Sequence, residues 1–250
     1  MSLHPAFLAA PIAHRGLHDV TKGRPENGLS AVRAALDAGY GLELDLQISS
    51  DGVAMVFHDY ELDRVTGETG QVKLRSAEDL GRITLASSED RIPRLPEVLD
   101  LVAGRVPILL EIKEQSRIMG PVDGALERAV AADLVDYEGP VAVMSFNPAS
   151  VAALAKAAPD VPRGLTSGSY GDPEWTPLGP AILDRFRALD GFDATGCSFI
   201  SHYHKDLSDP AVTALKARGI PVLCWTIRSP EAEAEARRIA DNVTFEGYLP

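Results

Sequence analysis

The sequence predicts one TIM barrel, a (β/α)8 fold with a small insertion after the second strand. Short apolar runs alternate with amphipathic segments along most of the chain, which is typical of parallel strands joined by right-handed helical crossovers. When the first hairpin is counted as one barrel strand plus an insertion, the strand-like runs number eight, enough to close a barrel. The length of 250 residues suits one such domain, 1–250. An open doubly wound sheet is the alternative.

The first part of the chain predicts a strand, a helix and a hairpin. Leu29, Val32 and Leu36 recur at helical spacing, and Gly39 follows them as a stop signal. The expected elements are a strand over 11–14, a helix over 26–38, a strand over 41–48, a turn over 49–52 and a hairpin partner over 53–57. Residues 60–94 are more polar, with one amphipathic piece over 76–82, and we interpret them as an excursion from the core.

From residue 95 onward the alternation is regular. The expected helices span 95–103, 122–134, 148–157, 181–189, 210–218 and 231–240. The expected strands span 107–112, 141–145, 163–165, 197–201, 221–225 and 243–246. Residues 166–180 are rich in Gly, Ser and Pro, so we expect a loop there.

Composition and charge limit the class of protein and its partners. The net charge of −12 disfavours nucleic acid and anionic membrane surfaces, so a phosphate-bearing substrate would need local cations. No segment is long and apolar enough to span a bilayer, and the N-terminus lacks the pattern of a secretory signal. Cys197 and Cys224 lie in apolar runs, and we expect both to be reduced core residues. These features predict a cytoplasmic protein without stable membrane association.

Titratable and aromatic side chains fall where the predicted strands end, which in a barrel is a single rim. They are His14 and Arg15 after the first strand, Glu43 and Asp45 in the second, Glu111 and Lys113 at the end of the third, and Trp225 at the end of the seventh. Because alternate strand residues share a face, the two acidic residues of the second strand point to the same side. We therefore expect these groups to form one site.

Three carboxylates on one rim repel each other unless a cation lies between them. Oxygen ligands favour Mg²⁺ or Ca²⁺, so Glu43, Asp45 and Glu111 predict a site for one divalent cation, with a salt-bridged rim as the alternative. His14 and His58 are candidate catalytic residues, because each lies next to a charged residue near this rim. A satisfied core histidine is the alternative for His14.

Several other residues allow two interpretations. Arg15 and Lys113 could be counter-ions of the carboxylates or could clamp a phosphate. The dipeptide Glu26-Asn27 could cap the following helix or serve the site, and Trp225 could line the site or pack in the core. His202 and His204 flank Tyr203 after the sixth strand, where a surface loop is favoured over substrate contact.

The motifs resemble those of the glycerophosphodiester phosphodiesterase family. They are, in order, His14-Arg15-Gly16, Pro25-Glu26-Asn27, Glu43-Leu44-Asp45, Asp51-Gly52, His58-Asp59, Pro96-Glu97, Leu110-Glu111-Ile112-Lys113, Ser145-Phe146 and Val222-Leu223-Cys224-Trp225-Thr226-Ile227. The resemblance implies an eight-stranded α/β barrel with an insertion at approximately 51–91. It also implies hydrolysis of a small-molecule glycerophosphodiester to glycerol 3-phosphate and an alcohol.

The resemblance further implies a role for each site residue. His14 and His58 look like the general acid and base, and Glu43, Asp45 and Glu111 look like the ligands of a divalent cation, Mg²⁺ or Ca²⁺. Arg15 and Lys113 look like the phosphate clamps, with Trp225 lining the pocket. A lysophospholipase D-type phosphodiesterase and a non-catalytic barrel that binds a phosphoryl ligand are the alternatives.

This sequence departs from the family pattern at three places. Gly28 replaces the usual threonine after Pro-Glu-Asn, residues 245–250 replace the usual Asp-x-Pro ending, and the loop with Tyr170 and Trp175 has no family counterpart. We expect none of the three to touch the chemistry, and all three to lie where the alcohol part of the substrate is recognised.

Overall fold

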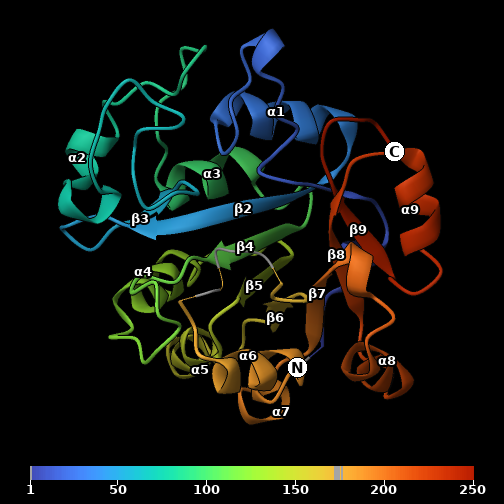
Figure 1. Cartoon of the computed structure of the whole chain (residues 1–250). Coiled ribbons are helices and arrows are strands. Elements are labelled where there is room, and N and C mark those ends of the chain that lie inside the picture. The colour runs from blue at the N-terminus through green and yellow to red at the C-terminus, as the bar shows by residue number, and fades with distance from the viewer. Residues whose placement is uncertain (1, 172–174, 176) are drawn as a thin grey trace.

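The computed structural model, described for residues 2–171, 175 and 177–250, is a closed barrel (Figure 1). The strand β1 (Ile12–Ala13) pairs in parallel with both β2 (Gly41–Ile48) and β9 (Asn242–Phe245), which joins the two edges of the sheet. The remaining parallel strands of the described chain are β4 (Ile108–Ile112), β5 (Val141–Ser145), β6 (Arg163–Ser167), β7 (Phe199–Tyr203) and β8 (Val222–Ile227). The predicted TIM barrel is thus confirmed, and the open-sheet alternative is wrong.

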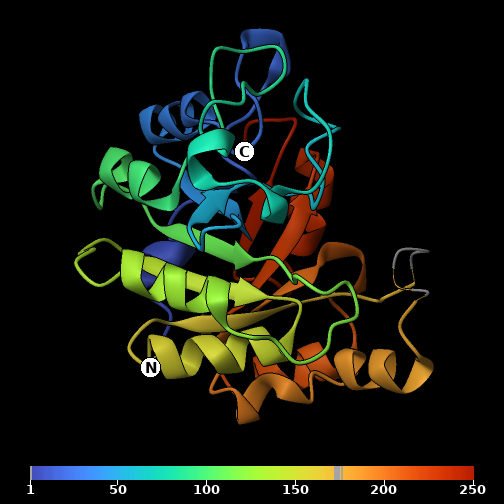
Figure 2. The same ribbon diagram turned by 90° about the vertical axis from the view of Figure 1, so that its left-hand side faces the viewer.

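Helices surround the strands, and Figure 2 shows α4 and α5 side by side outside the sheet. The α-helices are α1 (Leu29–Ala38), α2 (Ala77–Leu80), α3 (Leu95–Val102), α4 (Ala125–Asp133), α5 (Pro148–Ala157), α6 (Pro180–Arg187), α7 (Gly191–Ala194), α8 (Pro210–Ala217) and α9 (Pro230–Ala236). Single 3-10 turns are η1 (Pro5–Leu8), η2 (Val20–Lys22), η3 (Val72–Leu74) and η5 (His204–Asp206). No helix in the described ranges has the length and apolarity needed to cross a bilayer.

Two predicted boundaries are wrong for identifiable reasons. The helix expected from residue 26 begins at Leu29, because Asn27 has a left-handed backbone (φ 59°) that a helix cannot contain. The strand expected at 197–201 is β7, two residues later, because Cys197 still donates its backbone N–H to Phe192 of α7. Cys197 is partly buried and Cys224 is buried, and both are free thiols, as expected.

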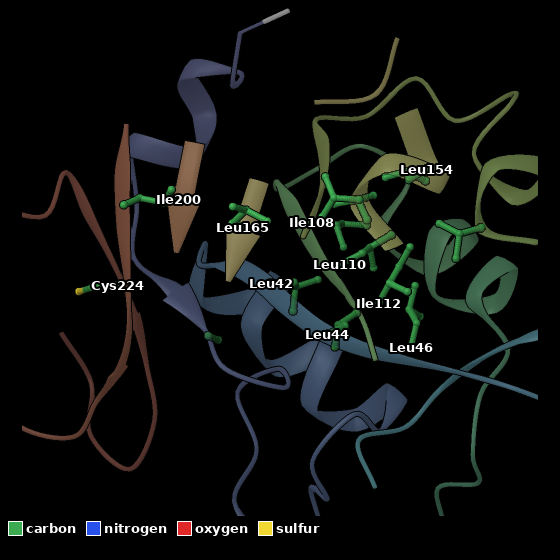
Figure 3. Packing of buried hydrophobic residues seen from close by; sticks show 14 of the residues in the cluster. Leu42, Leu44, Leu46, Ile108, Leu110, Ile112, Leu154, Leu165, Ile200 and Cys224 are labelled. Carbon is green, nitrogen blue, oxygen red and sulfur yellow. The ribbon is translucent and has the colours of Figure 1, made fainter. Parts of the chain in front are cut away.

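The strands are apolar on both faces only at one end of the barrel. Leu42, Leu44 and Leu46 of β2 point outward with Ile108 and Leu110 of β4, toward the helices (Figure 3). On the inner face, an apolar cluster including Phe7, Ile12, Leu109, Phe199 and Leu223 fills the N-terminal end of the barrel. The polar inner residues lie toward the C-terminal ends of the strands, where a barrel carries its site.

The segment between β3 (Ala54–Val56) and α3 has a small core of its own. The strand β3 runs antiparallel to β2, and the chain then projects beside the barrel with α2 (Figure 1). The buried residues of this core are Met55, Phe57, Leu62, Val72, Ala77, Leu80, Ile83, Leu85 and Ile92. Because Phe57 is anchored in this core, the next residue, His58, is held at the edge of the barrel mouth.

Candidate active site

The C-terminal ends of the strands open into a cleft of about 810 Å³. Every residue assigned to a site from the sequence lines this cleft: His14, Arg15, Glu43, Asp45, His58, Glu111, Lys113 and Trp225. They come from segments that lie up to 211 residues apart, taken as 225 minus 14. The fold thus brings together the groups that the strand-end pattern indicated.

Three buried carboxylates form one cluster on the charged wall of the cleft. Glu43 and Asp45 alternate with outward leucines in β2, and the register of β2 with β4 places Glu111 beside Asp45. One oxygen from each of the three carboxylates lies within 4.8 Å of the others. The spacing of two along β2 therefore places Glu43 and Asp45 on the same face of the strand, as strand geometry predicts.

Two cations contact the cluster. Lys113 Nζ lies 2.7 Å from Glu111 Oε1 and 3.3 Å from Asp45 Oδ1, and Arg15 Nε lies 3.3 Å from Asp45 Oδ2. The backbone N–H of Arg15 donates to Glu43 Oε2 at 3.0 Å. Arg15 and Lys113 are therefore counter-ions of the carboxylates in this structure, whatever they bind when a substrate is present.

Two cations do not balance three carboxylates, and the pKa values reflect the repulsion that remains in the cluster. Burial, with the charges of Asp45 and Glu111, raises the pKa of Glu43 well above its ordinary value. Burial also opposes ionisation of Asp45, but the neighbouring His58, Lys113 and Arg15 lower its pKa. An oxygen-only donor set with excess negative charge fits a hard divalent cation such as Mg²⁺ or Ca²⁺.

His14 is held by the closure of the barrel. Its backbone N–H donates to Phe245 O at 2.9 Å, and its Nδ1 lies 2.5 Å from Glu246 Oε2. Burial lowers the pKa of His14, and the Glu246 hydrogen bond offsets this only partly. Burial acts against ionisation of Glu246, but hydrogen bonding to His14 lowers its pKa, so the carboxylate is ionised. Because a carboxylate only accepts, Nδ1 carries the proton and Nε2 is free, 3.9 Å from Glu43 Oε2.

His58 reaches the same arrangement through a neighbouring residue. Its Nδ1 lies 2.6 Å from Asp59 Oδ1, and the side-chain amide of Gln47 donates to its backbone carbonyl at 2.9 Å. Burial opposes ionisation of Asp59, but hydrogen bonds from His58 and Arg64 lower its pKa. The same donor rule gives Nδ1 the proton and leaves Nε2 of His58 free.

An ion-pair network connects the His58 side of the cleft to the acidic cluster. Arg64 Nε lies 2.6 Å from Asp59 Oδ2, and its Nη2 lies 2.6 Å from Glu26 Oε1. The same Glu26 oxygen lies 2.8 Å from Arg15 Nη1, and Arg15 in turn contacts Asp45. Displacing Arg15 would therefore disturb the carboxylate that orients His58.

Asn27 supports the acidic cluster and does not cap the following helix. Its Nδ2 donates to Asp45 Oδ2 at 3.0 Å, and its Oδ1 accepts from the backbone N–H of Asp45 at 3.2 Å. The helix α1 has Gly28 at its N-cap, and the carboxylate of Asp90 accepts from its first turn. Glu26 binds arginines instead. The capping alternative for this dipeptide is thus wrong.

The departures from the family pattern now have structural accounts. A side chain at Gly28 would bring its Cβ within 2.6 Å of Asp90 Oδ2. The glycine therefore leaves room for Asp90, whose carboxylate caps α1 in place of the missing threonine. The expectation that the C-terminal ending does not touch the chemistry is wrong, because Glu246 holds the ring of His14. Trp175 of the third departure lines the cleft.

Sequence reasoning missed Glu246, Arg64 and Gln47. Gln47 follows Glu43 and Asp45 at the same spacing of two, so the alternation of β2 was a signal for it. Arg64 lies in a polar stretch without periodicity, and Glu246 lies 232 residues from His14. Neither of these two carries a local signal.

The wall opposite the acidic cluster is aromatic. The ring centroid of Phe146 lies 5.5 Å from that of Trp225 and 5.2 Å from that of Trp175. The ring centroid of Tyr170 lies 5.0 Å from that of Trp175. The indole N–H of Trp225 donates to Ser201 O at 3.0 Å, which fixes the ring at the cleft. Trp225 is therefore part of the cleft wall, not of the core.

The surface-loop interpretation of His202 is wrong. His202 lies within β7, is 3% exposed, and its Nδ1 lies 2.8 Å from Ser167 Oγ. It alternates with Ser201 and shares the outward face of Ile200, so it points away from the cleft. His204 is half-buried in η5, outside the residues that line the cleft.

Comparisons with known proteins agree on one family. The sequence model of the glycerophosphoryl diester phosphodiesterase family matches residues 14–243. A glycerophosphodiester phosphodiesterase of Caldanaerobacter subterraneus subsp. tengcongensis is 32% identical over 162 residues, 62% of this chain and 65% of that relative. One of Bacillus altitudinis is 35% identical over 159 residues, 60% of this chain and 62% of the relative. Each match thus covers less than two thirds of the relative's length.

The fold has solved counterparts. A phosphodiesterase of Oleispira antarctica, solved in complex with the product sn-glycerol 3-phosphate, aligns with a TM-score of 0.76 over 96% of this chain and 94% of that chain. The two chains are 22% identical, so this likeness supports the barrel fold and not the substrate.

Proposed function

The chain belongs to the glycerophosphoryl diester phosphodiesterase family, and from this premise we propose that it hydrolyses glycerophosphodiesters to glycerol 3-phosphate and an alcohol. The observation that carries the proposal is the pair of imidazoles whose Nδ1 atoms are each held by a carboxylate. His14 Nε2 lies 3.9 Å from Glu43 of the buried carboxylate cluster, and His58 lines the same cleft. Phosphodiester hydrolysis needs one group to take a proton and another to give one, and this arrangement supplies both.

Glu43, Asp45 and Glu111 would hold one divalent cation. When bound, Mg²⁺ or Ca²⁺ would neutralise phosphate charge and lower the pKa of an attacking hydroxyl. Arg15 and Lys113 would then be available to the non-bridging phosphate oxygens, because the carboxylates they now contact would hold the cation. Asn27 keeps Asp45 oriented throughout.

The two histidines would divide the proton transfers. One Nε2 accepts the proton of the attacking hydroxyl, and the other, protonated, donates to the departing alcohol oxygen. Glu246 and Asp59 stabilise the imidazolium form of their ring and keep it oriented during the exchange. The same pair can reverse roles in a second step.

The attacking hydroxyl is proposed to be the glycerol hydroxyl next to the phosphorylated carbon. A tethered hydroxyl has a large effective concentration, which contributes up to roughly 7–11 kcal/mol to lowering the barrier. A cyclic glycerol phosphate forms as the alcohol leaves, and water then opens it. An analogue lacking this hydroxyl should still bind but should react far more slowly. During turnover of the natural substrate, phosphorus NMR should show a transient cyclic phosphate. Equal turnover of the deoxy analogue would favour direct attack by water.

Release of glycerol 3-phosphate from glycerophosphocholine tests the proposed function, with Mg²⁺ or Ca²⁺ added back after EDTA treatment. We expect EDTA to abolish turnover and Glu43→Gln or Asp45→Asn to weaken divalent-ion binding measured by calorimetry. Asp90→Asn is the matched control, because Asp90 is an acidic residue that caps α1 and does not line the cleft. Full activity in EDTA would mean that hydrolysis does not need the metal. Unchanged divalent-ion affinity in both variants would place the metal site elsewhere.

The aromatic wall favours a second candidate, a lysophospholipase D-type substrate. Phe146, Trp175 and Trp225 offer apolar surface where the alcohol part of the substrate would lie. The ratio of kcat/KM for lysophosphatidylcholine to that for glycerophosphocholine decides between the two. A ratio above one that falls in Trp225→Leu would support the lipid substrate.

A further inference from the structure

A second group of metal-ligating side chains lies beside the acidic cluster and includes no member of it. One ligand atom each of His14, His18 and Glu246 lies within 4.8 Å of the others. Glu246 Oε2 lies 2.5 Å from His14 Nδ1 and 3.5 Å from His18 Nε2. The other oxygen, Oε1, contacts Arg228 Nε at 2.7 Å, which turns Oε2 toward the two imidazoles.

Within the described residues, His18 Nε2 makes only a weak charge contact, at 3.5 Å from Glu246 Oε2. The atom is buried and has no hydrogen-bond partner among the described residues, since 3.5 Å to Glu246 is too long. A buried polar atom without a partner is unfavourable, so an occupant that satisfies it would be stabilising. The ring is nonetheless 24% exposed, which leaves a path for an ion to enter.

We propose that His14, His18 and Glu246 bind a divalent transition metal such as Zn²⁺, and that this binding switches off hydrolysis. Two imidazole nitrogens and one carboxylate oxygen suit Zn²⁺, whereas Mg²⁺ and Ca²⁺ prefer oxygen-only sites. Tetrahedral Zn²⁺ with bonds of about 2.0–2.1 Å separates its ligands by roughly 3.3 Å. His18 and Glu246 are already close to this separation, and His14 needs to withdraw by less than about 1 Å from its 2.5 Å contact.

Inhibition follows from the tautomer of His14. In the structure, Nδ1 carries the proton and Nε2 is free. A metal ion on Nδ1 displaces that proton to Nε2, with no net change in protons on the ring. Nε2 can then no longer accept a proton, and as part of a metal-bound neutral imidazole it is too weak an acid to donate one. His14 is therefore lost to catalysis in either role.

The inhibition half of this proposal rests on the proposed function, but the binding half does not. Calorimetry with Zn²⁺ is therefore the first measurement, made with Mg²⁺ in excess so that the acidic cluster is occupied. We expect His18→Ala to weaken the Zn²⁺ affinity by about tenfold or more, as loss of a metal contact does. His4→Ala is the matched control, because it removes an exposed imidazole that caps η1, and the variant should bind Zn²⁺ as the parent does.

Turnover is the second measurement. Zn²⁺ should inhibit the parent and His4→Ala without relief by added Mg²⁺, while His18→Ala should keep the parent's basal rate and resist Zn²⁺. Unchanged Zn²⁺ affinity in both His18→Ala and His18→Gln would overturn the site. Inhibition that Mg²⁺ relieves would also overturn the proposal, because Zn²⁺ would then act at the acidic cluster. Loss of Zn²⁺ binding in His18→Ala without any hydrolysis by the parent would support the site and contradict the proposed function.

Discussion

The two histidines of the cleft reach the same geometry by different routes. His14 is 14% exposed, and its carboxylate partner, Glu246, comes from the other end of the chain. His58 is 28% exposed, and its partner is the next residue, Asp59. In both, Nδ1 meets an ionised carboxylate at 2.5–2.6 Å and Nε2 is left free.

The difference is one of dependence on the fold. The contact of His14 exists only when β1 pairs with β9, so closing the barrel also builds this half of the site. The contact of His58 is local, but Asp59 is also bound by Arg64, and Gln47 holds the backbone. His14 therefore depends on a carboxylate from the far end of the chain, and His58 on a neighbouring carboxylate that Arg64 also binds.

The largest expected effect tests whether the two histidines are equal partners. His14→Ala and His58→Ala should each reduce kcat by about 10²-fold or more, the range that loss of a general acid or base produces. KM should change little, because the charged wall that would hold the phosphate is intact. Steady-state kinetics with glycerophosphocholine give both constants.

His202→Ala is the matched control for this pair. It removes a buried imidazole that points away from the cleft, so kcat should stay close to that of the parent. Turnover within tenfold of the parent in either cleft variant would remove that histidine from the mechanism.

The next effect separates the two supports. Glu246→Gln should reduce kcat by about 10–100-fold, the scale of losing a residue that orients a functional side chain. Asp59→Asn should cost less, because Arg64 and Gln47 still hold the segment around His58. An equal loss in both variants would show that the separation along the chain between a histidine and its carboxylate does not matter to the support.

The sequence was sufficient for the parts of the site that strand geometry controls. Glu43, Asp45 and Glu111 follow from alternation in β2 and from parallel register with β4, both of which are local rules. Most strands and helices followed from hydrophobic period for the same reason. The range of β2, Gly41–Ile48, was predicted to the residue.

The remainder depends on contacts that no local pattern encodes. Glu246 follows β9 and contacts His14 only because β9 pairs with β1 when the barrel closes. The start of α1 was misplaced because Asn27 bonds to Asp45 instead of capping, and this contact exists only in the folded site. His202 looked like a loop residue because β7 begins two residues later than its composition indicates.

A smaller effect should come from Arg64, which is 48% exposed. Arg64→Met removes the contacts to Asp59 and Glu26 and keeps the apolar stem of the side chain. Exposed ion pairs contribute about 0.2–1 kcal/mol, so we expect a loss in kcat of about fivefold at most. The loss should shrink as KCl is raised, because salt already weakens this pair in the parent. A loss as large as that of His58→Ala would make Arg64 part of the chemistry.

The smallest expected effect concerns stability and distinguishes the two sides by pH. Burial lowers the pKa of His14 in the folded protein, so between the unfolded value of about 6.5 and the folded value the unfolded chain binds more protons. The stability linked to His14 is therefore present at pH 7 and is lost as pH falls below about 6.5. Asp59 has a lowered folded pKa, so its contribution to stability persists to lower pH and is lost only as pH falls below about 4.

Urea unfolding of the metal-free protein at pH 7, 5.5 and 3.5 separates these windows. His14→Gln should flatten the first drop, and Asp59→Asn only the second. Burial also lowers the pKa of His202 and of His204, so both contribute to the first window and to the drop that remains in His14→Gln. A first drop unchanged in His14→Gln would mean that burial does not control the protonation of His14.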